Sequence, residues 1–225
     1  PGRQCFKILV QHMPESAWFT RGSYRQNILH VLCNEIDDVI FFVNIIDNVP
    51  KNAWLHENSQ GNTPLHDACL SQLPKGLLQL LLDATVKHKV IKNVLEETTN
   101  FGYTCLHCAC DKNLSTDSLR LLVSFFPSNE SFKLVLASKV HNRTPPDLAL
   151  NDEHKKLLED PNCWRNCRYW LFCNYRETFL NSLYPNSPEK TLEALKELHK
   201  NYTDDESLKK AVAEIEAKIN SMLKG

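Results

Sequence analysis

Apolar residues recur at helical spacing through most of the chain, and the runs are separated by proline, glycine or small polar residues. In one stretch Thr63 is suited to cap a helix and Pro64 to occupy its first position, so we expect a short helix ending near Ser71. Pro74 then breaks the chain. A second helix with a broad buried stripe is predicted by the leucines that follow, namely Leu77, Leu78, Leu80, Leu81 and Leu82.

This two-helix pattern occurs in four segments of the chain. Its most regular position is occupied by His30, His66, His107 and Asp147, in steps of 36, 41 and 40 residues. A large apolar residue precedes each of these positions by 12 residues: Trp18, Trp54, Leu95 and Val135. Agreement at two positions in four segments indicates a repeat architecture.

The third and fourth segments predict the same elements. Thr104 caps a helix that ends near Cys110, and a second helix carries Leu119, Leu121, Leu122 and Phe125. In the fourth segment the second helix is short, from about Asp152 to Glu159. The segments Val90–Leu95 and Phe132–Leu136 each predict a further helical turn between the second helix and the next motif.

The residues Gly61-Asn-Thr-Pro-Leu-His-Asp-Ala68 resemble the Gly-x-Thr-Pro-Leu-His-x-Ala motif of the ankyrin repeat, and Gly102–Ala109 is a good second match. The first unit has Arg25 in place of glycine, and the fourth has Asn142 there and Asp147 in place of histidine. The resemblance implies an all-α, ankyrin-type helical repeat solenoid. Its units are longer than the roughly 33 residues usual for ankyrin repeats, so we expect reshaped β-hairpin fingers.

The resemblance covers roughly residues 3–160, and we assign residues 1–160 to ankyrin-like repeats. They comprise a partial unit over 3–20, in which Cys5–Met13 would be a second helix, and units around 21–56, 57–97, 98–137 and 138–160. Because the chain begins Pro-Gly-Arg without methionine, we expect a fragment of something longer.

The recurring histidines invite a catalytic or metal-binding interpretation, but repetition at one position favours a structural role. In the ankyrin family this imidazole hydrogen-bonds backbone near the turn. We therefore expect His30, His66 and His107 to be structural, with the preceding Leu29, Leu65 and Leu106 in the core.

Nine cysteines, an odd number, predict reduced thiols and an intracellular, cytoplasmic protein, with the nucleus as an alternative. Cys105, Cys108 and His107 resemble half of a zinc site, which Cys163 and Cys167 would have to complete. Cys69 and Cys110 occupy equivalent positions that are normally small and buried. We therefore expect packing, with no metal and no cofactor.

Beyond Asp160-Pro161, residues 161–225 predict a C-terminal helical region. An aromatic helix over 162–184 would carry one face formed by Trp164, Cys167, Leu171, Tyr175, Phe179 and Leu183. Arginines 165, 168 and 176 interleave with aromatic residues, a composition typical of single-strand nucleic-acid platforms and of protein-binding hot spots. We favour a cap over the open end of the repeats.

An αα-hairpin is expected over 187–224. Its first helix begins at Ser187-Pro188, and its second follows a predicted capping box formed by Thr203 and Glu206. Packing within the chain is the simplest role for this hairpin, and a partner groove or a dimer seam is the alternative.

Composition changes this picture little. The chain has 225 residues, with Lys+Arg 26 against Asp+Glu 27, so binding through many phosphates is disfavoured. No apolar run approaches the roughly 18 residues of a membrane span. No phosphate loop, Gly-x-Ser-x-Gly or His-Glu-x-x-His motif occurs, so we expect neither enzymatic activity nor a small-molecule substrate.

The expected function is protein binding through the turn tips and the concave face of a rigid scaffold. By position in the repeat, the contact residues would be Tyr24, Gln26, Asn34, Glu35, Gln60, Asn62, Leu70, Ser71, Phe101, Tyr103, Asp111 and Lys112. The alternatives are a regulatory or substrate-receptor part of a larger enzyme, a microbial effector acting on host proteins, and a nucleic-acid binder that uses the arginine-aromatic helix.

Overall fold

A computed structural model describes residues 12–19, 23–35, 39–46, 48–181 and 187–222. Within these ranges the chain is helical and contains no strand, apart from an isolated bridge between Val140 and Arg143. The expected all-α class is confirmed. None of the helices in this part of the chain is both long and apolar enough to cross a membrane.

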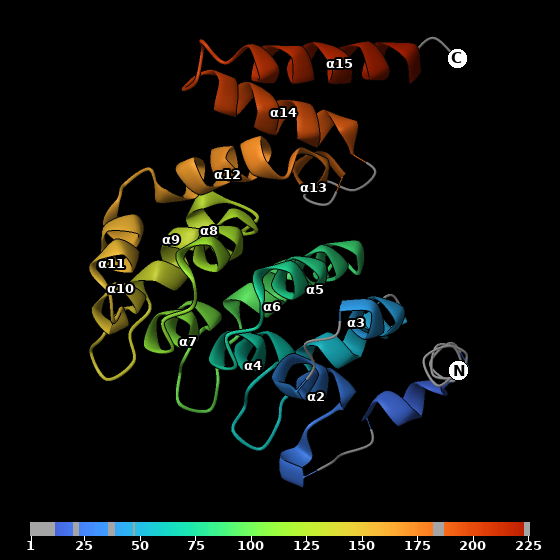
Figure 1. Cartoon of the computed structure of the whole chain (residues 1–225), viewed down its shortest axis with the longest axis vertical. Coiled ribbons are helices and arrows are strands. Elements are labelled where there is room, and N and C mark those ends of the chain that lie inside the picture. Colours follow the sequence, from blue (N-terminus) through green and yellow to red (C-terminus); the bar gives the residue numbers. More distant parts are fainter. Residues whose placement is uncertain (1–11, 20–22, 36–38, 47, 182–186, 223–225) are drawn as a thin grey trace.

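Four short helices lie side by side in a first row (Figure 1). They are α2 (Ile28–Glu35), α4 (Pro64–Leu70), α7 (Cys105–Asp111) and α10 (Pro145–Leu148). Thr63, Thr104 and Thr144 precede the last three of these helices, each in the extended conformation of a helix cap. Leu29, Leu65 and Leu106 are fully buried, as expected.

A second row is formed by α3 (Val39–Ile46), α5 (Lys75–Lys87) and α8 (Thr116–Ser124). The next helix to pack on α8 is chiefly α12 (Cys163–Asn174), whereas α11 (Asp152–Glu159) makes fewer contacts with it. The indole Nε1 of Trp164 donates to the carbonyl of Phe126, at 3.0 Å. The surface that Trp164 meets therefore belongs to the third unit rather than to the fourth.

The inserted segments form a third set of short helices. They are η1 (Glu15–Phe19), η3 (Lys51–Leu55), α6 (Ile91–Glu96) and α9 (Asn129–Ala137). The predicted helical turns at α6 and α9 are confirmed. Each member contributes its large apolar residue to the core, and Trp18, Trp54, Leu95 and Val135 are all buried.

The aromatic segment is not a single helix. It divides at Tyr175, whose backbone leaves the helical region (φ −142°, ψ 56°), into α12 and α13 (Arg176–Asn181). The break brings Phe179 back against Phe172, with ring centroids 5.6 Å apart, and both rings are buried. The expectation of one continuous helix over 162–184 is wrong for this reason. Its end, with Leu183, lies outside the described residues, as does the predicted helix at Cys5–Met13, apart from its last two residues.

The C-terminal hairpin consists of α14 (Pro188–His199) and α15 (Glu206–Met222), which pack on each other. Its connecting loop is tied to α12 because the Tyr169 and Tyr202 rings stack, with centroids 3.7 Å apart. Asp205 caps α15 by accepting the backbone N–H of Leu208, at 3.0 Å. The predicted cap, Thr203, stands too far before the first helical residue to do this.

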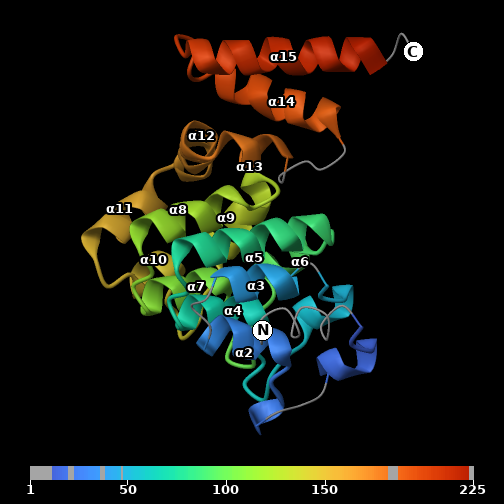
Figure 2. The same ribbon diagram turned by 45° about the vertical axis from the view of Figure 1, so that its right-hand side comes forward.

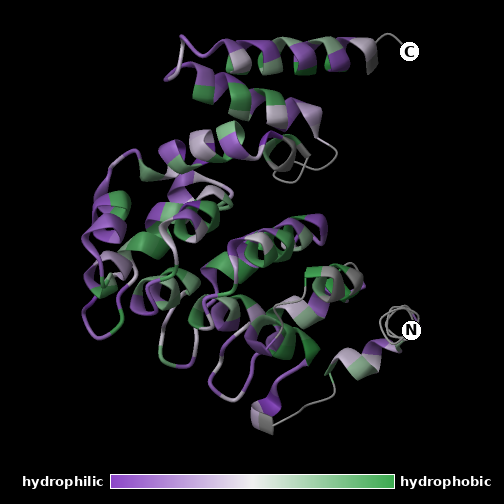
Figure 3. Ribbon diagram, in the orientation of Figure 1, coloured by the Kyte–Doolittle hydropathy of each residue, from purple (hydrophilic) through white to green (hydrophobic). Residues whose placement is uncertain are grey.

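The distribution of polarity follows these rows. The buried apolar residues lie mostly on the helices, whereas the loops that project beyond the first row are largely hydrophilic (Figure 3). The turned view shows the C-terminal hairpin beyond the end of the rows, on the side of α12 (Figure 2). The projecting loops are thus left free of the C-terminal region.

Candidate partner-binding surface

The loops before the first-row helices share one backbone feature. Positions Arg25, Gly61, Gly102 and Asn142 are all left-handed, with φ of 59°, 76°, 82° and 63°. Glycine adopts this conformation freely, and asparagine tolerates it better than most residues. At Gly61 a side chain is also excluded by space, because a Cβ atom would lie 2.4 Å from the backbone nitrogen of Asn100.

Backbone hydrogen bonds join neighbouring turns. The N–H of Ser59 donates to the carbonyl of Tyr24 at 2.8 Å, and the N–H of Asn100 donates to the carbonyl of Gln60 at 3.1 Å. The second, third and fourth turns are also closed on themselves, for example by the 2.9 Å bond from the N–H of Thr99 to the carbonyl of Tyr103. The first three turns are therefore held in register along the row.

The buried histidines reinforce the same register. His66 accepts the backbone N–H of Thr63 at Nδ1, at 3.2 Å, and its Nε2 bonds the carbonyl of Tyr103 in the next turn, at 3.1 Å. His30 does the same one unit earlier, with 2.8 Å between Nε2 and the carbonyl of Asn62. These contacts give the histidines the structural position that the repeat predicted.

Burial lowers the pKa of His66 to about 4, and the pKa of His30 and His107 is lowered by the same cause. For His66 the neutral ring is the form that the site needs, because Nδ1 accepts the Thr63 N–H while Nε2 donates to the Tyr103 carbonyl.

A polar pocket of about 340 Å³ opens between the first two turns. Its lining comes from the turns and from the facing ends of α2 and α4, and consists of Tyr24, Gln26, Asn34, Asn58, Ser59, Gln60, Asn62, Asp67, Leu70 and Ser71. Seven of the twelve sequence-predicted contact residues meet here: Tyr24, Gln26, Asn34, Gln60, Asn62, Leu70 and Ser71.

Asp67 forms the charged part of this pocket and is only 3% exposed. Its carboxylate accepts the side-chain amides of Asn62 at 2.8 Å, Asn34 at 3.1 Å and Asn58 at 3.4 Å. Burial raises the pKa of Asp67, and the amide hydrogen bonds act in the opposite direction. The three asparagines thus hold a carboxylate at a position from which water is largely excluded.

The other five predicted contact residues lie outside the pocket. Phe101 is 66% exposed at the tip of the third turn. Tyr103 has a core role that its sequence position did not reveal, because its ring packs on His107, with centroids 5.8 Å apart. The remaining three are accessible: Glu35, Asp111 and Lys112.

Sequence reasoning missed Asp67, Asn58 and Ser59. One signal was present, because Asp67 follows the motif histidine at a position that holds Val31, Cys108 and Leu148 in the other units. Because the equivalent residues of the other units are apolar, a carboxylate at this position needs hydrogen-bond or charge partners to be buried. The partners themselves come from two different units, which sequence alone does not bring together.

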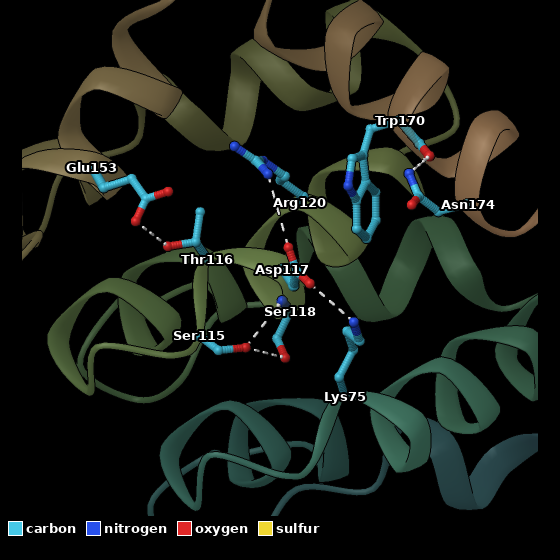
Figure 4. Close-up of polar contacts among 9 residues, drawn as sticks. All are labelled: Lys75, Ser115, Thr116, Asp117, Ser118, Arg120, Glu153, Trp170 and Asn174. Atoms are coloured by element: carbon cyan, nitrogen blue, oxygen red, sulfur yellow. Dashed lines mark hydrogen bonds and ion pairs between the residues drawn. The ribbon is translucent and has the colours of Figure 1, made fainter.

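A second polar cluster ties the second-row helices together (Figure 4). Asp117, in the first turn of α8, pairs with Lys75 of α5 at 2.9 Å and with Arg120 at 3.8 Å. Thr116 donates to Glu153 of α11 at 2.9 Å, and the Trp170 indole points from α12 toward α8. All these charges are partly exposed, so their chief effect is to orient neighbouring helices rather than to stabilise them strongly.

The arginine-aromatic set of α12 and α13 is used within the chain. Arg168 is 3% exposed, lies over the Trp164 ring at 4.7 Å and donates to the carbonyl of Ser124 at 3.2 Å. Arg176 pairs with Glu214 of α15 at 2.8 Å. A single-strand platform needs free cations beside free rings. These side chains instead attach α12 to α8 and α13 to α15.

The cysteines described by the structure are free thiols, and Cys105, Cys108 and Cys110 are buried. Burial raises the pKa of Cys108 and Cys110 to about 12. Cys163 and Cys167 face each other on α12, with their sulfur atoms 4.0 Å apart. Over the described ranges, no three His, Cys, Asp or Glu side chains are grouped so as to hold a metal ion.

Comparison with protein-family models gives no match to this chain, and comparison with curated proteins finds no relative.

Proposed function

We propose that the chain is a rigid ankyrin-type repeat scaffold that binds a protein partner along its row of turns and first-row helices. The observation that carries this proposal is the linkage of successive turns, by the Ser59–Tyr24 and Asn100–Gln60 backbone bonds and by the buried histidines. A surface whose geometry is fixed before binding loses little conformational freedom when a partner docks. The resemblance of the motif supports the ankyrin assignment.

The exposed side chains on this row suit protein recognition. Tyr24 and Phe101 are 77% and 66% exposed at the tips of the first and third turns. Aromatic residues are enriched among the few that dominate binding energy. The free, buried thiols fit a reducing compartment, which is where we place the protein.

The test is capture of a partner by the full chain, compared with a double variant that removes both tip rings, Tyr24→Ala with Phe101→Ala. Leu134→Ala is the matched control, because Leu134 is 67% exposed but lies on α9, away from the turns. A partner that is retained by the wild type and the Leu134 variant, and lost from the tip variant, supports the proposal. A partner held equally by all three proteins would contradict it.

A further inference from the structure

We propose that the pocket between the first two turns receives an arginine side chain of the partner, with the carboxylate of Asp67 as its counter-charge. This inference rests on the proposed function and names the chemistry of the partner at one point of the surface. Four features of the pocket support it: its charge, its acceptors, its aromatic rim and its cost to the folded chain.

The charge of the pocket has one sign. Asp67 is the one charged residue among the described residues that line the pocket, and Lys and Arg are absent from that lining. Three side-chain amides hold the carboxylate in place, but they neutralise no charge. An anionic ligand would meet repulsion here, whereas a cation would complete a buried ion pair.

The hydrogen-bonding capacity of the pocket is also biased toward a donor-rich ligand. A carboxylate has about four lone-pair sites, and the amides of Asn34, Asn58 and Asn62 occupy three of them. Asn34 and Asn62 also carry side-chain oxygen atoms that can accept hydrogen bonds, whereas the oxygen of Asn58 already accepts the N–H groups of Gln60 and Asn62. Guanidinium is planar, donates through five N–H groups and accepts none, so it suits several spread acceptors better than a compact ammonium group.

The residues at the rim of the pocket can contact the guanidinium plane and the methylene groups of an arginine side chain. Tyr24 lines the mouth and is largely exposed, so its ring is available to a guanidinium plane or to the methylenes behind it. Leu70 adds the apolar surface on which such a stem packs.

Burying a carboxylate away from water destabilises the folded state unless hydrogen bonds or a counter-charge compensate for the lost hydration. The equivalent positions Val31, Cys108 and Leu148 show that the repeat is built with apolar residues at this place. In the second unit alone the chain replaces them with Asp67 and surrounds it with amides from two units. A pocket that binds a cation accounts for this substitution.

The experiment is an NMR titration of the full ¹⁵N-labelled chain at pH 7 with N-acetyl-arginine methylamide. The control ligand is the citrulline analogue, which has the same shape but no charge. We expect saturable shifts of the side-chain amide signals of Asn34, Asn58 and Asn62 with arginine, and binding at least tenfold weaker with citrulline. Shifts of equal size with both ligands would overturn the proposal.

Three variants sharpen the test. Asp67→Asn should weaken arginine binding at least tenfold, and the matched Asp152→Asn, exposed on α11 outside the pocket, should leave it unchanged. If Asp67→Asn fails to fold, Gln26→Lys places a tethered cation at the pocket and should block the ligand while leaving Asp67 intact. Arginine binding that survives the Asp67 or Gln26 change would overturn the proposal. N-acetyl-lysine methylamide is titrated in the same way, and binding as tight as that of the arginine compound would overturn the choice of arginine.

The two proposals fail separately. If the arginine analogue does not bind while partner capture still depends on Tyr24 and Phe101, the pocket assignment alone is wrong. If the analogue binds but no partner depends on the tips, the protein-binding proposal is wrong.

Discussion

The imidazole Nε2 of His66 lies 3.1 Å from the carbonyl oxygen of Tyr103, a residue 37 positions further along the chain. The same ring accepts the N–H of Thr63 at the start of its own helix. One buried side chain therefore completes a local helix cap and a contact between two units. This double role makes the recurring histidine a structural element that should be sensitive to mutation.

Replacing this imidazole should destabilise the protein. His66→Ala leaves the Thr63 N–H and the Tyr103 carbonyl without their partner, and we expect a loss of about 1–3 kcal/mol in the free energy of unfolding. Denaturant unfolding of the variant and the wild type measures this loss. His12→Ala, which changes an exposed side chain, should have little effect. A His66 variant of unchanged stability would show that the ring does not hold the turns.

Stability should fall as the pH is lowered below about 6.5. The pKa of His66 in the folded protein is about 4, below the 6.5 of the unfolded chain, so the unfolded state binds the proton first. The stabilisation is complete above pH 6.5 and is lost progressively as the pH approaches 4. Between pH 6.5 and pH 5 this one group accounts for roughly 2 kcal/mol. Unfolding midpoints across this range measure the slope, and a His66→Gln variant should show a smaller one.

The contact between α12 and α8 should be a major source of stability. Trp164 is 9% exposed and hydrogen-bonds the Phe126 carbonyl, so Trp164→Ala should cost about 3–5 kcal/mol. Truncation after Asp160 removes α12 entirely and should yield a poorly soluble or strongly destabilised protein. Melting curves of the full chain and of residues 1–160 form the matched pair, and coincident curves would mean that α12 does not cover the repeats.

Asp205 should matter more than its neighbour Asp204. It caps α15 and accepts the hydroxyl of Tyr169, at 2.5 Å, so Asp205→Ala should cost about 0.5–2 kcal/mol. Hydrogen bonds from Ser207, Tyr169 and Leu208 lower the pKa of Asp205 to about 2. Its contribution is therefore complete above the ordinary pKa of an aspartate and is lost as the pH falls through about 2. Thermal melts of the two alanine variants at pH 7 compare the residues, and equal losses would rule out the cap.

The buried thiols should be inert in the folded protein. Cys105, Cys108 and Cys110 are enclosed, whereas Cys173 is exposed. We expect iodoacetamide to modify Cys173 and to spare those three cysteines until denaturant is added. Peptide mapping of a Cys5→Ser background reads this pattern without interference from Cys5. Elemental analysis should find far less than one zinc ion per chain, and stoichiometric zinc that leaves only on unfolding would overturn the packing interpretation.

The predictable parts of the fold are those fixed by residues close in sequence. The cap formed by Thr104 and His107 spans three positions, and the short helix Asp152–Glu159 begins and ends where its sequence pattern does. The division of the aromatic helix at Tyr175 was not predictable, because it depends on how Phe179 packs against Phe172 after the chain has turned. The helical spacing of apolar residues continues across Tyr175, so the sequence pattern does not indicate the break.

The candidate site, too, was predictable only in part. The residues that project from the turns could be predicted from their position in the repeat, because equivalent positions project from the turn in every unit. The three amides that converge on Asp67 come from a helix of one unit and a turn of the next, so their meeting depends on how the units stack. The inward packing of the Tyr103 ring onto His107 was not predictable for a related reason, because it depends on how the turn folds over the helix.

The packing of α12 on α8 has an evolutionary consequence. Repeat proteins change length when whole units are duplicated or lost, and each new unit needs a neighbour with a matching second-row helix. Here that place beside the third unit is held by α12, a helix of different sequence that also contacts α9, α11 and α13 and, through the Tyr169–Tyr202 stack, the C-terminal hairpin. A unit inserted after Asp160 would therefore find the surface of α8 already covered by α12.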